Sequence, residues 1–200
     1  FHNEVDYLND ESFYTPLGAT SLTYNPLKKF SKSEILPSEI DDYFRNQTLH
    51  GYVHDMGAAM MNGINGNAGL FANSNDVAKM MQMYLQEGYY GGKKYFEPKT
   101  VHKFNNRYFE KDSVRRGLGF DKPQLNSNDT DIALATSKYA SSTSFGHSGF
   151  TGTYVWADPE AGLLYVFLSN RVYPTMSNNK LRVNNIKIKI LDLVYESIIK

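Results

Sequence analysis

The chain has 200 residues, of which 41% are hydrophobic and 14% aromatic, enough apolar material for one globular domain or a large part of one. Its 21 basic and 21 acidic residues balance, so we expect no nucleic-acid partner and no attraction to an anionic membrane. Cysteine is absent, which excludes disulfides, thiolate catalysis and zinc sites with cysteine ligands.

Regular patterns are few in the first sixty residues. Phe1–Phe13 mixes charged and aromatic residues in a way that predicts the end of a helix, and the prolines and glycine that follow predict a loop. Lys28–Met60 has weak periodicity, which predicts a polar loop. His50 and His54 have the spacing of some zinc ligands, but no convincing third ligand accompanies them. We therefore expect no metal here, and no cofactor elsewhere.

An amphipathic helix is predicted between Asn73 and Gly88. Asn73 is a suitable N-cap with Asp76 at the third helical position, and Gly88 is a suitable end. One face of this helix carries the apolar residues Val77, Met80, Met81, Tyr84 and Leu85. Three glycines precede it, but no strand leads into them and no Lys-Ser/Thr follows, so the pattern does not predict a phosphate site.

The last third of the chain predicts an antiparallel sheet covered by a helix. Gly117–Asp121 is predicted to be a short strand, and Pro123–Ser144 a long loop. Thr151–Ala157 and Leu163–Ser169 alternate as strands of a hairpin should, with a tight polar turn between them. A terminal helix is expected to bury one face against this hairpin, with the residues Val183, Ile186, Ile190, Leu193, Val194, Ser197 and Ile198.

The sequence FGHSGFTGTY, Phe145–Tyr154, places a histidine beside a serine. His147 and Ser148 do not make a catalytic pair by adjacency alone, because neighbours in a strand point to opposite faces. The nucleophile pattern Gly-x-Ser-x-Gly also fails, since Phe150 stands where the final glycine should be. The stretch therefore needs another explanation.

Five blocks together resemble the C-terminal half of the serine β-lactamase-related hydrolases. In chain order they are PLGATSLTYNP, GNAGLFANSNDVAKMMQMYLQEG, RRGLGFD, FGHSGFTGTYVWADPEAGLLYVFLSNR and the terminal helix. That family includes class C β-lactamases, penicillin-binding D,D-peptidases and esterases, and the chain most resembles the β-lactamase-like domains of Bacteroides-type bacteria. The resemblance implies part of an α+β, β-lactamase/D,D-peptidase-like fold, with an antiparallel sheet, a C-terminal helix and a helical region.

The resemblance also implies roles for four consecutive residues. His147-Ser148-Gly149 resembles the third motif of the family, of the Lys-Thr-Gly type, with histidine in place of lysine. In that position His147 would be catalytic, and Ser148 and Gly149 would lie against the substrate. The backbone N–H of Phe150 would be one of the two oxyanion donors.

The other family motifs are expected outside these residues. Ser177-Asn178-Asn179-Lys180 spells Ser-x-x-Lys and Tyr7-Leu8-Asn9 spells Tyr-x-Asn, but both stand in the wrong place for the family. Ser177 in particular follows a proline in a polar stretch, whereas the family nucleophile must begin a buried helix. Residues 1–200 are therefore expected to be the C-terminal portion of one domain, without its first strands and nucleophile helix, and to be inactive alone.

Two functions from different classes stay open at this point. One is a fragment of a serine hydrolase that forms an acyl-enzyme on an ester, amide or β-lactam, acting on a small-molecule or peptidoglycan-like substrate. The other is a non-catalytic module that binds cell wall or carbohydrate through some of its 15 tyrosines and 12 phenylalanines. Exposed coplanar rings would favour binding, and a groove ending at Ser148 would favour catalysis.

Location and assembly are the last expectations from sequence. No signal peptide and no membrane-spanning segment are expected, and the family resemblance alone implies a periplasmic or secreted protein. Because the first strands of the domain would be missing, the sheet is expected to have an exposed or intermolecularly paired edge, through which a dimer could form.

Overall fold

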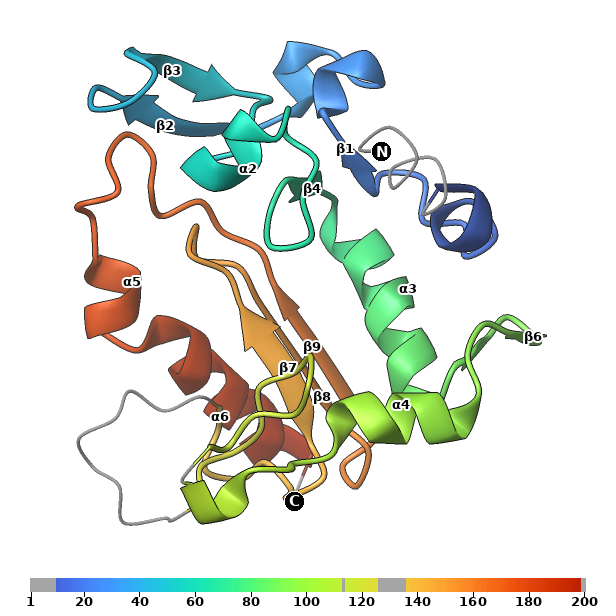
Figure 1. Ribbon diagram of the computed structural model, residues 1–200. Coiled ribbons are helices and arrows are strands. Elements are labelled where there is room, and N and C mark those ends of the chain that lie inside the picture. Colours follow the sequence, from blue (N-terminus) through green and yellow to red (C-terminus); the bar gives the residue numbers. More distant parts are fainter. Residues whose placement is uncertain (1–9, 113, 126–135, 199–200) are drawn as a thin grey trace. The chain divides into compact units, whose positions relative to one another are not determined.

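A computed structural model describes residues 10–112, 114–125 and 136–198 of the chain (Figure 1). The chain divides into two compact units. The first comprises Phe1–Val77, Phe150–Thr153 and Leu168–Lys180, and the second comprises Ala78–Gly149, Tyr154–Phe167 and Leu181–Lys200. Among the helices of the described residues, none has the length and apolar character needed to cross a membrane.

The first unit is built from short elements joined by long turns. They are the π-helix η1 (Asp10–Tyr14), the 3-10 helices η2 (Pro26–Lys28) and η3 (Lys32–Glu34), the strands β1 (Thr23–Tyr24), β2 (Pro37–Asp41), β3 (Gln47–His50) and β4 (Leu70–Phe71), and the helix α2 (Met56–Met60). Strand β1 pairs with β4 and strand β2 with β3, both antiparallel. The η1 helix agrees with the helix end that was predicted within Phe1–Phe13. Residues 1–9 of that segment lie outside the described residues.

The polar loop predicted over Lys28–Met60 is wrong, because β2 and β3 form a hairpin there and α2 follows it. Strand β2 escapes detection because its pattern is inverted. Glu39 and Asp41 are buried, at 1% and 0% exposed, whereas Ile40 is 47% exposed. A pattern read from apolar residues cannot recognise a strand whose buried face is charged.

The predicted helix is confirmed as α3 (Ser74–Leu85), whose first turn belongs to the first unit and whose remainder belongs to the second. Asn73 caps it, since its Oδ1 accepts a hydrogen bond of 2.9 Å from the Asp76 N–H. The Asp76 carboxylate in turn accepts two hydrogen bonds of 2.7 Å, from the backbone N–H and the hydroxyl of Ser21. Gly88 ends the helical run with φ +96°, a conformation that glycine adopts without strain.

The second unit contains a three-stranded sheet, several helices and a small hairpin. Its elements are the strands β5 (Tyr89–Tyr90), β6 (Lys93–Lys94), β7 (Phe145–Ser148), β8 (Tyr154–Asp158) and β9 (Leu163–Phe167), the helices α4 (Pro98–Asn105) and α6 (Ile186–Ile198), and the 3-10 helix η4 (Glu110–Asp112). A short helix, α5 (Lys180–Val183), begins on the last residue of the first unit. The sheet has the antiparallel order β7-β8-β9, so the predicted hairpin is confirmed with shorter strands.

The third strand of this sheet was predicted in the wrong place. Gly117–Asp121 forms no strand, and only Asp121 bridges to Gly146, while Phe145–Ser148 supplies the third strand as β7. Gly146 allows β7 to approach β8 closely. A Cβ atom on Gly146 would lie 2.1 Å from the Val155 carbonyl oxygen and 2.3 Å from Cε3 of the Trp156 ring.

Helix α6 packs on the sheet as predicted, but with a different face. The core of this unit consists of Tyr154 and Trp156 from β8 and of Ile188, Leu191 and Tyr195 from α6, all between 0% and 3% exposed. The predicted face is largely in solvent, with Leu193 65% and Val183 78% exposed. The buried face is chosen in part by the Tyr195 hydroxyl, which donates a hydrogen bond of 2.6 Å to the Asp158 carboxylate.

A buried lysine, Lys122, lies in the same unit as the sheet. Its Nζ donates hydrogen bonds to the Thr143 carbonyl oxygen at 2.8 Å and to the Asn105 side-chain oxygen at 3.1 Å. Burial lowers the pKa of Lys122 to about 8, the nearby Arg107 acts in the same direction, and Asp158 opposes the shift. The folded protein therefore holds the Lys122 proton less tightly than the unfolded chain does.

The free energy of unfolding is expected to rise as the pH increases from about 8 to about 9.5. Lys122 should contribute on the order of 1 kcal/mol to this rise. In this range the unfolded chain still binds the lysine proton, whereas the folded protein is losing it, so raising the pH favours the folded state. Urea unfolding at several pH values measures this slope. Lys122→Met keeps the aliphatic stem without the charge and should reduce the slope; an unchanged slope would contradict the assignment.

Candidate functional site

The His-Ser-Gly sequence lies at the exposed end of β7. His147 and Ser148 are the last two residues of the strand and pair with Val155 and Tyr154 of β8. Both are exposed, as is Gly149, which follows immediately, whereas the first two residues of β7 are buried. The strand is thus anchored at one end and presents the predicted motif to solvent at the other.

The His147 ring is held in one orientation by two polar contacts. Nη2 of Arg116 lies 2.7 Å from Nε2 of His147, and Nδ1 of His147 lies 2.9 Å from the Ser148 carbonyl oxygen. A guanidinium group has only donors, so Nε2 accepts and the ring proton sits on Nδ1, from which it is donated to that carbonyl. Arg116 and the Ser148 carbonyl oxygen together set the tautomer of this ring.

The buried carboxylate of Asp121 contacts both Arg116 and Arg115. Oδ1 of Asp121 lies 3.1 Å from Nε of Arg116 and 3.2 Å from Nη1 of Arg115. These contacts have the distance of ion pairs but not the angles of hydrogen bonds. Asp121 therefore contacts Arg116, which in turn contacts His147 in the exposed motif. The sequence did not predict these contacts, although both arginines and the aspartate belong to the block RRGLGFD.

The fourth predicted residue, Phe150, belongs to the first unit. Phe150 is 62% exposed, yet its ring stacks on the His54 ring with centroids 5.4 Å apart. Its carbonyl oxygen accepts a hydrogen bond of 3.0 Å from Nε of Arg171. None of the described residues of the same unit accepts a hydrogen bond from its backbone N–H, which leaves this N–H available as a donor to a ligand. The catalytic and binding roles of all four residues stay predictions.

The two sequences that imitate family motifs have different outcomes. Ser177 is exposed and lies in a turn, where its hydroxyl is 3.1 Å from that of Thr175. The helix that follows begins only at Lys180, so Ser177 does not start a helix, as the family nucleophile is expected to do. Tyr7-Leu8-Asn9 lies outside the described residues.

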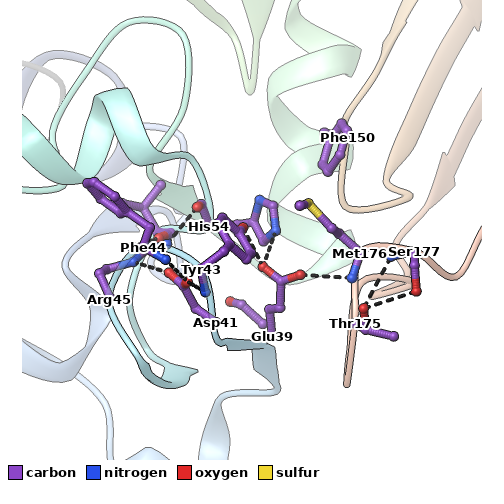
Figure 2. A network of polar contacts seen from close by, with 12 residues as sticks. Glu39, Asp41, Tyr43, Phe44, Arg45, His54, Phe150, Thr175, Met176 and Ser177 are labelled. Carbon is purple, nitrogen blue, oxygen red and sulfur yellow. Dashed lines mark hydrogen bonds and ion pairs between the residues drawn. The ribbon is translucent and has the colours of Figure 1, made fainter.

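The two histidines with zinc-like spacing have other partners. Nε2 of His50 lies 2.5 Å from the Ile35 carbonyl oxygen, and Nε2 of His54 lies 2.9 Å from Glu39 (Figure 2). Within the described ranges, no group of three or more histidine, aspartate or glutamate side chains is arranged to hold a metal ion. The zinc interpretation therefore gains no support.

The aromatic residues bear on the alternative of a binding module. Tyr154 and Trp156 have nearly parallel rings, 2° apart, and both lie in the core of the second unit. Tyr84 and Phe96 also stack, and both are partly buried. Stacking in these pairs contributes to packing and does not offer flat exposed platforms for a sugar.

Comparison with known proteins identifies the family of the chain. The sequence profile of the β-lactamase family matches residues 9–188. Proteins named "Putative D-alanyl-D-alanine carboxypeptidase" from Salmonella agona and Salmonella gallinarum are 33% identical over 192 residues, which cover 90% of this chain and 43% of theirs. The chain thus spans less than half the length of these curated relatives.

Solved structures share the fold at lower identity. A β-lactamase from Mycobacterium bovis matches with a TM-score of 0.58 at 19% identity. The match covers 96% of this chain and 55% of the M. bovis chain. Simvastatin synthase from Aspergillus terreus has a TM-score of 0.58 at 16% identity, over 96% of this chain and 50% of its own. A penicillin-binding protein homologue from Caulobacter crescentus has a TM-score of 0.52 at 18% identity, over 82% and 46%.

The resemblance inferred from five sequence blocks is confirmed by these matches, as is the α+β fold with its antiparallel sheet and C-terminal helix. The profile covers most of the chain, including the hairpin β8–β9 and the strand that ends in His147 and Ser148. The chain belongs to the β-lactamase family.

Proposed function

We propose that this chain supplies the strand-motif side of the active site of a serine hydrolase. In such an enzyme a serine attacks the carbonyl carbon of an ester, amide or β-lactam and forms an acyl-enzyme, which water then hydrolyses. The observation that carries the proposal is the exposed end of β7, where Arg116 contacts the His147 ring beside Ser148 and Gly149. Membership of the β-lactamase family supports the same reaction class.

Each residue of the motif has a role that its chemistry allows. The Phe150 N–H would donate to the carbonyl oxygen as negative charge develops on it, which requires a distance of about 2.7–3.1 Å in the transition state. Gly149 has no Cβ atom and would leave room for the acyl part of the substrate beside the strand. His147 would orient the substrate or a hydroxyl of the second family motif through its neutral imidazole.

We further propose that the nucleophile and the second motif are supplied by sequence outside these 200 residues. The 43% coverage of the curated relatives supports this, as does the position of Ser177 in an exposed turn. Oxyanion donors without a nucleophile and its base leave most of the barrier in place, so the 200 residues alone would be inactive.

The names of the relatives suggest the first substrate to test. They point to the amide bond between two D-alanine residues, as found in peptidoglycan. Cleavage of that bond would release a terminal D-alanine and transfer the remaining acyl group to the serine. A peptidoglycan substrate would place the protein in the periplasm or outside the cell.

Trapping of the acyl-enzyme tests this proposal. The whole protein that carries this sequence is incubated with a fluorophosphonate or penicillin probe, and the modified residue is located by mass spectrometry. We expect one adduct on a serine outside the 200 residues, together with hydrolysis of a D-Ala-D-Ala peptide or a p-nitrophenyl ester. An adduct on Ser148 or Ser177, or the absence of both labelling and hydrolysis, would contradict the proposal.

A further inference from the structure

One buried carboxylate, Glu39 of β2, joins three segments of the first unit (Figure 2). Its Oε2 accepts a hydrogen bond of 2.8 Å from the Tyr43 hydroxyl and lies 2.9 Å from Nε2 of His54. Its Oε1 accepts a hydrogen bond of 2.8 Å from the backbone N–H of Met176, in the loop after β9. Burying a carboxylate at 1% exposure is costly unless such partners compensate it.

A second carboxylate fixes the backbone that carries His54. Nε of Arg45 donates a hydrogen bond of 2.8 Å to Asp41, while Nη1 and Nη2 donate to the carbonyl oxygens of Val53 at 2.7 Å and His54 at 2.8 Å. Burial alone would raise the pKa of Asp41, but the hydrogen bonds from Arg45 and from the backbone outweigh it and lower that pKa to about 2. Asp41 is therefore charged at neutral pH, and His54 is held by its carbonyl as well as by its ring.

The His54 ring lies against Phe150. The two ring planes differ by 28° at a centroid separation of 5.4 Å, which is a stacked arrangement. Nε2 of His54 and Oε2 of Glu39 are 2.9 Å apart, without hydrogen-bond geometry, so this close contact limits the orientations open to the ring. A buried carboxylate is thus connected, through one histidine, to a phenylalanine that is itself mostly exposed.

Arg171 holds Phe150 as well. Its guanidinium carbon lies 4.6 Å from the centre of the Phe150 ring, and its Nε donates to the Phe150 carbonyl oxygen at 3.0 Å. Its backbone N–H donates a hydrogen bond of 2.9 Å to the carbonyl oxygen of Thr151. An exposed phenylalanine would ordinarily have rotational freedom, but two planar side chains restrict this one. The ring and the carbonyl group of Phe150 are both fixed within the first unit.

We propose that Glu39 and His54 are positioning residues that hold the Phe150 N–H in place for the oxyanion of the reaction. This inference rests on the function proposed above, in which that N–H is an oxyanion donor. Neither side chain needs to touch the substrate. His54 acts through the Phe150 ring, and Glu39 acts through His54. Removing an oxyanion donor costs about 100- to 1,000-fold in kcat, and a displacement of about 1 Å can cost about 100-fold.

A double-mutant cycle in the whole protein tests the coupling. His54→Ala and Phe150→Ala are each expected to lower kcat by about 10- to 100-fold with KM nearly unchanged, because the donor acts mainly in the transition state. If His54 acts through the Phe150 ring, the double variant should be no slower than the slower single variant. Phe150→Tyr keeps a ring in place and should restore most of the rate.

A second histidine–glutamate pair provides the matched control. Nε2 of His102 lies 3.1 Å from Glu87, and both side chains are 57% exposed in the second unit. His102→Ala should leave kcat and KM unchanged. Rate losses of His54→Ala and Phe150→Ala that multiply in the double variant would overturn the proposal. So would a loss that the melting temperature alone explains.

A measurement independent of turnover separates this inference from the proposed function. In protein labelled with ¹⁵N-phenylalanine, the Phe150 amide resonance is expected to shift or broaden in His54→Ala and in Glu39→Gln, but not in His102→Ala. An unchanged Phe150 resonance in His54→Ala would overturn the positioning role even in an active enzyme. If the whole protein shows no hydrolysis, the proposed function fails, and this resonance still decides the positioning role.

Discussion

His147→Ala in the whole protein is expected to lower kcat/KM by about 10- to 1,000-fold, the range for losing an acid–base or oxyanion partner. The melting temperature should change little, because the side chain is exposed at the end of β7 and takes no part in the core. Its two polar contacts, with Arg116 and with the Ser148 carbonyl oxygen, orient the ring without supporting the sheet. Steady-state kinetics and thermal unfolding on one preparation measure both quantities.

A lysine at the same position gives the complementary result. His147→Lys introduces the residue that the family motif more commonly has, so part of the activity should remain. The pH optimum should move upward, because an ammonium group titrates far above an imidazole. If His147→Ala instead lowers the melting temperature and leaves the rate per folded molecule unchanged, His147 only stabilises the end of the strand and has no role in the reaction.

The elements that sequence predicted well are those in which local pattern and packing agree. Asn73 and Gly88 mark the two ends of α3 by capping chemistry that needs no distant partner. The hairpin β8–β9 follows from period-two alternation around a tight turn, with Gly162 at φ +59°. Local rules suffice in both cases, and tertiary structure only moves the boundaries by a few residues.

The errors arise where distant contacts decide. Strand β7 has only four residues, and Gly146 leaves the room that its close approach to β8 requires. Helix α6 has apolar residues on more than one face. The face that contains Leu191 and Tyr195 is buried because it fits β8 and because the Tyr195 hydroxyl reaches Asp158. No periodicity in the helix itself distinguishes that face from the exposed one that contains Leu193.

For the candidate site, sequence supplied the motif but not its support. His147, Ser148, Gly149 and Phe150 were found because they are consecutive and resemble a known pattern. Arg116 stands 31 residues before His147, so its contact with that ring could not be read from spacing. Similarly, Glu39 belongs to a strand that hydrophobic pattern did not reveal. Contacts between residues so far apart in the sequence become visible only in the fold.

Trp156→Ala is expected to lower the free energy of unfolding by about 3–5 kcal/mol, a large share of the roughly 5–15 kcal/mol of a typical domain. Trp156 is the only tryptophan in the chain and is 0% exposed in the core between β8 and α6. Its ring lies 5.8 Å from that of Tyr154, centre to centre, so its removal leaves a cavity and an unstacked ring. Circular dichroism during urea unfolding measures the loss, because the variant has no tryptophan fluorescence.

A phenylalanine at the same position should be far less damaging, with a loss of less than about 2 kcal/mol. None of the described residues accepts a hydrogen bond from the indole Nε1–H of Trp156, so removing this donor breaks no hydrogen bond to them. Trp156→Phe removes that donor and keeps a ring against Tyr154, which offsets part of the lost volume. Equal losses for the alanine and phenylalanine variants would mean that the indole nitrogen has a partner, such as an ordered water, whose hydrogen bond stabilises the core.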